Sequence, residues 1–205
     1  MTVLPMFPLG NVLMPGGPLS LHVFEDRYRQ LVRDCVEAVD HEFGVVLIDR
    51  GHEVGGGDVR RPVGTVARMV QVAELPDGRF AVIAFGMRRF RVSEWLPDGP
   101  YPIAAVDDWP DLDEHVDDDQ FAAVVQRTRR TLALAVELGD EVADPSFDLN
   151  DDHALAIYQL AGLAPVGAAD AYELLCAAGP ATRLALLDEL LADVEATQAF
   201  RLQSP

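Results

Sequence analysis

The sequence predicts an α+β protein: a small mixed β pseudo-barrel with one early helix, followed by a small all-α helical bundle. Short runs of β-branched and apolar residues, separated by proline and glycine turns, fill the first 106 residues. In the second half the apolar residues recur instead at the three- and four-residue spacing of helices. A chain of 205 residues that is 49% hydrophobic is long enough for two small domains, each with its own core.

The first half is expected to contain several strands and one helix. Strands are predicted over residues 3–7, 19–24, 43–48, 63–75, 80–85, 88–95 and 101–106, and the run at 63–75 is long enough to be bent or bulged. A stripe of apolar residues predicts an amphipathic helix over 25–40, formed by Tyr28, Leu31, Val32, Cys35, Val36 and Val39. Short strands with a single early helix favour a mixed barrel over βαβ winding.

Residues 107–119 are predicted to be a solvated acidic linker. The segment holds eight acidic residues and no arginine, with Pro110 near its middle. It lacks the mid-loop glycine and the twelfth-position glutamate of an EF-hand, so a calcium loop is not expected. The predicted domains are therefore a β domain over residues 1–110 and an acidic helical bundle over residues 117–205.

Four helices are expected after the linker. Asp117 and Gln120 fit an N-cap and its N3 partner for the first helix. Asn150 is predicted to cap the second, with two aspartates in its first turn. The third is expected over 168–178, ending before Gly179, and the fourth over 180–202, where leucines are spaced three and four residues apart.

Charge and composition exclude several classes of function. All 16 basic residues are arginine, so a P-loop lysine, a Schiff-base lysine and a Ser–Lys dyad are all absent. Residues 1–106 carry 11 arginines against 13 acidic residues, whereas residues 107–205 carry 5 against 21. A phosphate backbone or an anionic membrane would be repelled by the second half, so neither nucleic acid nor a membrane is an expected partner.

The cysteines and the N-terminal segment predict a cytoplasmic protein. Cys35 and Cys176 lie far apart in apolar helical patterns and are expected to be buried free thiols. The first residues lack a charged region followed by a long apolar run, and no stretch has the length of a membrane span.

No catalytic, cofactor or metal site is predicted. The serines lie outside any G-x-S-x-G motif, and the histidines have no paired metal-ligand spacing. The glycines at 55–57 lack phosphate-loop spacing. Two pairs, His52 with Glu53 and Asp152 with His153, leave open a metal-dependent hydrolase as an alternative, although two ligands do not make a site.

An RNA-binding module is a second alternative, because three arginines cluster on one predicted strand. Strand alternation places Arg89 and Arg91 on one face and Phe90 and Val92 on the other. RNA binding favours aromatic side chains on the same face as the arginines. The arrangement therefore predicts a solvated strand face.

Several motifs in the first half occur together and in a fixed order. They are LPMFPL at 4–9, VLMPG at 12–16, LSLHVFEDRYR at 19–29, FGVVLI at 43–48, VGTVA at 63–67, DGR at 77–79, GMRRFRV at 86–92 and YP at 101–102. In this order they resemble the N-terminal, substrate-binding domain of Lon proteases, and the helical half resembles the bundle that follows this domain in the family.

The resemblance implies a PUA-like pseudo-barrel followed by a helical bundle. It further implies a non-catalytic protein that recognises exposed or unfolded polypeptide segments or a partner protein, with a protease or a chaperone among the candidates. Asp26, Arg27 and Gln30 match the family's helix after the Leu-x-Val-Phe strand and are the expected binding residues, exposed opposite the apolar stripe. No cofactor is implied, and no oligomeric state is predicted.

Overall fold

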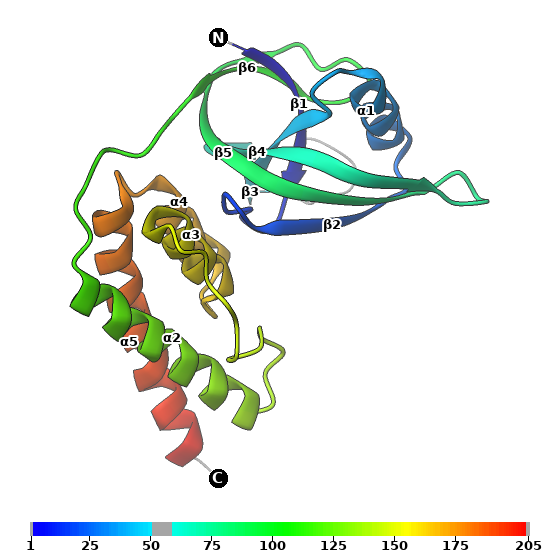
Figure 1. Ribbon diagram of the computed structural model, residues 1–205. Coiled ribbons are helices and arrows are strands. Elements are labelled where there is room, and N and C mark those ends of the chain that lie inside the picture. Colours follow the sequence, from blue (N-terminus) through cyan, green and yellow to red (C-terminus); the bar gives the residue numbers. More distant parts are fainter. Residues whose placement is uncertain (1, 51–58, 204–205) are drawn as a thin grey trace. The chain divides into compact units, whose positions relative to one another are not determined.

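The computed structural model describes residues 2–50 and 59–203, which form two compact units, residues 1–110 and 111–205 (Figure 1). Within the described residues, the first unit contains six strands and one helix, and the second contains four helices. This mixed architecture confirms the predicted α+β class. No described helix combines the length and the apolar character that crossing a membrane requires.

The six strands of the first unit form a sheet that closes on itself. The strands are β1 (Thr2–Leu9), β2 (Pro18–Val23), β3 (Glu42–Arg50), β4 (Val59–Glu74), β5 (Phe80–Leu96) and β6 (Ile103–Asp108). Their order is β2-β5-β4-β3-β1-β6, and an additional β5–β6 pairing joins β6 back to β5. Only the β1–β3 pair is parallel among the described pairings. The closure leaves β2 outside the ring, paired with β5.

Strand β5 is continuous, although two strands were predicted over 80–85 and 88–95. Its pairing with β4 passes from Gly86 opposite Ala67 to Arg88 opposite Val66, so Met87 is an extra residue in a β-bulge. The two predicted strands are therefore one strand, interrupted only by this bulge near Gly86. Strand β4 carries register shifts in the same pairing, as its length predicted.

Helix α1 (Asp26–Glu37) is shorter than the predicted 25–40. Tyr28, Leu31, Val32 and Cys35 are buried, as the apolar stripe indicated, but the last two residues of the stripe, Val36 and Val39, are 47% and 94% exposed. The helix ends because Ala38 is extended and His41 takes a positive φ of 53°. The His41 ring lies 2.9 Å from the Cys35 carbonyl oxygen through Nδ1, which holds the turn against the helix end.

Two apolar clusters form the core of the first unit. One gathers the buried face of α1 with residues of β1, β2, β4 and β5, including Phe7, Leu21 and Phe80. The other gathers Leu4, Val66 and Phe90 with their neighbours on β1, β3 and β6.

Within the segment 107–119, predicted to be a solvated linker, residues 109–117 form no helix or strand, and most of them are exposed. Asp107 and Asp108 belong to β6, and from Asp111 onward the segment belongs to the second unit and contacts its last helix. Asp111 accepts two hydrogen bonds from Arg183, at 2.8 and 3.1 Å. Glu114 accepts hydrogen bonds from the backbone N–H and the hydroxyl of Thr182, at the start of the last helix. The negative charges have specific partners, which composition does not show.

The second unit consists of α2 (Asp118–Glu137), α3 (His153–Leu163), α4 (Ala168–Cys176) and α5 (Pro180–Gln203), and α5 contacts the other three. Asp117 caps α2 as predicted, since its side chain accepts from the Gln120 N–H at 2.8 Å. The N-cap of α3 is Asp152 rather than Asn150. Asn150 lies two residues earlier and accepts from the Asp152 N–H instead. Helix α4 ends at Cys176, two residues before the predicted end.

Candidate functional site

A glycine bulge sets the register of the edge strand β2. Gly16 has a φ of +78° and donates to the Gly86 carbonyl at 2.8 Å, while the Gly86 N–H donates to Gly17 at 2.9 Å. This is the pattern of a G1-type bulge, which needs glycine at the positive φ. Gly86 is required as well, because a Cβ there would lie 2.3 Å from the Met14 carbonyl oxygen.

This register determines which backbone N–H and C=O groups of β2 bond to β5 and which face away from it. Gly17 and Gly86 form a hydrogen-bonded pair, and such pairs alternate along an antiparallel ladder. Leu19 and Leu21 therefore bond to β5, while the N–H and C=O groups of Ser20 and His22 face the opposite edge. Within the described part of the chain, β5 is the one ladder partner of β2.

This open edge carries none of the charges with which proteins usually protect an edge strand. The six residues Pro18–Val23 include no acidic or basic side chain other than His22. The next residue, Phe24, is 55% exposed. An extended polypeptide could pair with such an edge without displacing a charged side chain.

A pocket of about 200 Å³ lies beside this edge. It is lined by Phe7, Leu9, Ser20, Leu21, His22, Val23, Phe24, Glu25 and Tyr28. The rings of Phe7 and Tyr28 stack with centroids 4.2 Å apart, and the Arg27 guanidinium lies 4.4 Å from the centre of the Tyr28 ring. Arg27 also pairs with Glu25 at 3.1 Å. The pocket thus has apolar and aromatic walls with one ion pair at its border.

Apolar side chains are also exposed on the outer face of β5. Ile83 and Phe85 are 38% and 41% exposed, and they stand opposite Ser20 and Pro18 of β2. Met87, the bulged residue, is 41% exposed. The sheet therefore offers apolar surface next to the open edge, at the end of the unit where β2 runs alongside β5 (Figure 1).

Only one of the three expected binding residues adjoins the pocket. Arg27 contacts two pocket residues, as described above, and is half-buried rather than exposed. Asp26 is exposed and pairs with Arg29 at 2.9 Å. Gln30 is half-buried and donates to Asp34 at 2.7 Å. Neither Asp26 nor Gln30 lines the pocket.

The aromatic residues of the pocket were missed by the sequence analysis. Phe7 and Tyr28 were assigned to core elements only. Phe24 carried a usable signal, because Leu21 and Val23 point inward and strand alternation then turns the next side chain outward. An outward-facing aromatic residue indicates a binding surface when other exposed apolar residues adjoin it, as Ile83 and Phe85 do on the neighbouring strand.

The described residues do not form a metal site that would support the alternative of a metal-dependent hydrolase. Asp152 caps α3 by accepting from the Ala154 N–H, and the His153 ring stacks on Phe121 with centroids 4.2 Å apart. Across residues 2–50 and 59–203, no group of three or more potential ligands is arranged to hold a metal ion. His52, Glu53 and the glycines at 55–57 lie outside the described residues.

The strand face that carries Arg89 and Arg91 was predicted to be solvated, and it is so only in part, because Arg91 is exposed whereas Arg89 is buried. The two guanidinium groups lie 4.5 and 4.2 Å from the centre of the Trp109 ring, and Arg89 is only 3% exposed. Phe90 occupies the core on the opposite face, so the predicted alternation is confirmed. Trp109, which is distant in sequence, contacts both guanidinium groups, and strand periodicity alone does not reveal that contact.

Comparison with known proteins assigns the chain to a family. The family model described as the ATP-dependent protease La (LON) substrate-binding domain matches residues 3–193. The chain therefore belongs to the Lon substrate-binding domain family, as the sequence motifs indicated.

The relatives are much longer than this chain. A Lon protease of Flavobacterium johnsoniae is 31% identical over 137 residues, which are 66% of this chain and 16% of the relative. Lon protease 2 of Myxococcus xanthus is 38% identical over 108 residues, which are 51% of this chain and 13% of the relative. The chain thus spans less than a fifth of these proteases, and the similarity lies in their N-terminal part.

Solved structures have the same fold. The crystal structure of a Lon N-terminal domain protein from Xanthomonas campestris has a TM-score of 0.69 and 31% identity, covering 94% of this chain and 98% of the other. The N-terminal domain of the Mycobacterium avium complex Lon protease has a TM-score of 0.61 at 17% identity, covering 94% and 99%. The second comparison supports the fold alone.

Proposed function

We propose that this chain is a non-catalytic recognition protein that binds exposed or unfolded polypeptide segments in an extended conformation. The bound segment adds a strand to the open edge of β2 and places an apolar side chain in the pocket beside Phe24. In this arrangement main-chain hydrogen bonds provide affinity for many sequences, and the pocket selects apolar side chains. The PUA-like description of the first unit and the bundle description of the second are part of this proposal.

The uncharged open edge next to an aromatic pocket is the observation that carries the proposal. A solvated edge with no other role would be expected to carry a charge, a proline or a bulge that prevents pairing. In β2 the proline, Pro18, and the bulge both lie at the start of the strand, so the backbone N–H and C=O groups of Ser20 and His22 stay available. Family membership agrees with this role, since the matched region is the substrate-binding domain of the longer proteases.

We infer the absence of catalysis from the chain itself. It contains no lysine, so neither a P-loop lysine nor a Ser–Lys dyad is present in these 205 residues. The matched family region also lies outside the ATPase and protease domains. Binding should therefore be independent of ATP.

The first test compares native lactalbumin with its reduced, carboxamidomethylated form, which has the same side-chain charges but no stable fold. We expect the unfolded form to bind more tightly, by fluorescence anisotropy, with no change on adding ATP. Equal affinity for the two forms would overturn the proposal that unfolded segments are recognised.

A proline at position 20 tests where the segment binds. Ser20→Pro removes an N–H group that faces away from β5, so no hydrogen bond of the sheet is lost. Because one main-chain hydrogen bond contributes about 1 kcal/mol, we expect affinity for the unfolded probe to fall by about fivefold or more. Ser20→Ala retains the N–H and is the matched control. Unchanged binding by Ser20→Pro, with its urea midpoint unaltered, would place the site elsewhere.

A second pair of variants tests the pocket. Phe24→Ser removes the exposed ring beside the edge, and Val39→Ser removes an apolar side chain outside the pocket that is even more exposed. The first substitution should weaken binding and the second should not. Equal losses would indicate general adhesion to apolar surface rather than a pocket.

A further inference from the structure

Strand β2 has one apolar face and one polar face. Leu21 and Val23 are buried, whereas Ser20 and His22, which alternate with them, are exposed. Because successive side chains of a strand point to opposite sides of the sheet, the two pairs meet different surroundings. A side chain brought to the open edge of β2 therefore meets the core side of the sheet or the solvent side, according to the face on which it lies.

The pocket beside β2 belongs to the core side. Leu21 and Val23 lie in the same apolar cluster as Phe7 and Tyr28, and all four residues line the pocket. Leu9, which packs against this cluster, lines it as well. Since both inward-facing residues at this end of β2 form part of the wall, the pocket extends along two successive inward positions of the strand.

A strand added at this edge would continue the alternation of β2. Paired strands lie about 4.8 Å apart, and the side chains of residues directly opposite each other point to the same face. The residues of the added segment opposite Leu21 and Val23 therefore lie on the pocket side. The residue between them lies opposite His22, on the outer face. The same holds for either direction of the added strand, because side chains alternate in both.

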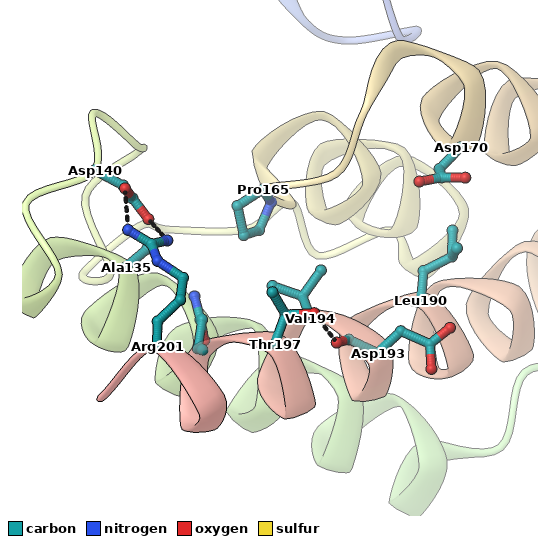
Figure 2. Close-up of a pocket in the computed structure, with 10 residues that line it drawn as sticks. Ala135, Asp140, Pro165, Asp170, Leu190, Asp193, Val194, Thr197 and Arg201 are labelled. Atoms are coloured by element: carbon teal, nitrogen blue, oxygen red, sulfur yellow. Dashed lines mark hydrogen bonds and ion pairs between the residues drawn. The ribbon is translucent and has the colours of Figure 1, made fainter. Parts of the chain in front are cut away.

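A larger pocket in the second unit lacks these properties. It has a volume of about 360 Å³, and its walls come from α2, α4, α5 and the connections between helices (Figure 2). Helical backbone groups are hydrogen-bonded within their own helix, so these walls offer no strand edge. Four of the ten lining residues are charged, and two of those, Asp140 and Arg201, form an ion pair. Of these two pockets, the one beside β2 combines apolar walls with available backbone groups.

We propose that the β2 site selects polypeptide segments in which two apolar residues lie two positions apart, the pattern of an amphipathic strand. The inference rests on the proposed function, because it takes strand addition at β2 as its starting point. Two apolar residues at this spacing both face the pocket when the segment is extended. Two apolar residues three positions apart, as on one face of a helix, point to opposite faces, so one of them is left in solvent. The substrate class is therefore unfolded stretches that alternate apolar and polar residues.

Two fluorescently labelled peptides of identical composition test this selection. Each has about nine residues, enough to span a strand, with one leucine and one phenylalanine among serines and asparagines. In the first peptide the two apolar residues lie two positions apart, and in the second they lie three positions apart. We expect the first peptide to bind the whole chain about fivefold more tightly, measured by fluorescence anisotropy, because both of its apolar side chains are removed from water instead of one.

Two variants locate the selection on the molecule. Phe24→Ser removes an aromatic wall of the pocket beside β2, so the ratio of the two peptide affinities should fall toward one. Asp193→Asn alters the pocket of the second unit, shown in Figure 2, and should leave the ratio at its wild-type value. Because the ratio compares two peptides on the same protein, a lower folded fraction in a variant does not change it.

Several results would overturn the inference. Equal affinity for the two peptides, or tighter binding of the second, would show that spacing is not selected. Failure of both peptides to bind while unfolded lactalbumin binds would show that the alternating pattern is not what is recognised, and it would leave the proposed function standing. If neither the peptides nor unfolded lactalbumin bind, the proposed function itself is wrong. An equal change of the ratio in Phe24→Ser and Asp193→Asn would show that the selection does not arise at β2.

Discussion

Arg183 illustrates how one buried charge organises the second unit. Its side chain is fully buried and donates to Asp111, to the Leu174 carbonyl and to the Ala177 carbonyl. Its guanidinium also lies 3.8 Å from the centre of the Tyr158 ring. Each of its three guanidinium nitrogens donates to an acceptor, so this one side chain joins the segment that follows the first unit to the helices, alongside the hydrogen bonds between Glu114 and Thr182.

Removing the partner charge should destabilise this unit strongly. Asp111→Asn leaves a buried guanidinium opposite a neutral amide, and breaking a buried ion pair in this way is unfavourable by about 3–5 kcal/mol. We expect a loss of that order in the free energy of unfolding, measured by urea denaturation monitored by helical circular dichroism. The control Asp113→Asn alters an exposed residue of the same segment and should change it by less than about 0.5 kcal/mol. Similar effects of both substitutions would contradict this role for Arg183.

Two raised pKa values make the first unit sensitive to alkali. Burial, and then the charge of Asp34, raise the pKa of Cys35 to about 12. Burial, and then a hydrogen bond to Asp34 at 2.6 Å, raise the pKa of Tyr101. In the unfolded chain the cysteine thiol has a pKa of about 8.5 and the tyrosine phenol a pKa of about 10, whereas in the folded protein both groups keep their protons at these pH values. Their contribution to stability is present below those values and is lost as pH rises toward the folded pKa values.

Tyr101→Phe should reveal this dependence. At neutral pH we expect the variant to be less stable by about 1 kcal/mol, because the hydrogen bond to Asp34 is lost. Above about pH 10 the wild type loses stability as its unfolded state releases the phenolic proton, whereas phenylalanine does not ionise. The difference in free energy of unfolding between the two proteins should therefore shrink as pH rises from 9 to about 11. A constant difference would show that the phenol does not titrate differently on folding.

At the scale of elements, the start of β2 depends on two glycines for different reasons. Gly16 needs its positive φ, although no atom lies within 4 Å of a Cβ there. Gly86 needs space, since a Cβ would meet the Met14 carbonyl. Because backbone atoms cannot move aside as a flexible side chain can, the second requirement is the stricter one.

Alanine substitutions should separate these two requirements. Gly16→Ala should lower the free energy of unfolding by about 1–2 kcal/mol, the strain of a positive φ. Gly86→Ala should lower it by more, because β2 must move away from β5. Hydrogen exchange should then show faster exchange at the Leu19 and Leu21 amides in Gly86→Ala. Slower exchange there, or a larger loss of stability in Gly16→Ala, would contradict the register assigned to β2.

Element prediction succeeded where local periodicity matches burial, as along Tyr28, Leu31 and Val32 of α1. It failed where a distant contact decides. The Met87 bulge is accommodated by β4, and the cap of α3 lies at Asp152 because Asn150 is engaged within the preceding turn. Cys176 was expected to be buried but is only partly so, since α4 ends at that residue. None of these neighbours is specified by residue spacing.

At the scale of the whole molecule, the chain divides into two units, and each unit has its own apolar core. The first unit is built around the two apolar clusters of the sheet, and the second around fully buried residues such as Leu132, Leu160 and Leu187. Both units are within the size range of independently folding domains. The charge is concentrated in the second unit, so its stability should depend more strongly on salt.

Fragments 1–110 and 111–205 should each fold. We expect a cooperative urea transition for each fragment, with strand-type circular dichroism for the first and helical dichroism for the second. The second fragment must begin at Asp111 to retain the partner of Arg183; a fragment beginning at 117 should be less stable by several kcal/mol, about the effect of losing that ion pair. Failure of the first fragment to fold alone would show that its core depends on the helices.

The sequence by itself determined the family, the α+β class, most strands and helices, and the absence of lysine-dependent chemistry, because these follow from local order and composition. Only the tertiary structure decided which groups remain available for binding. The open edge of β2 and the pocket beside Phe24 each depend on which distant residues do or do not cover a polar or apolar group. Such coverage is a property of packing in three dimensions, and residues adjacent in the chain do not encode it.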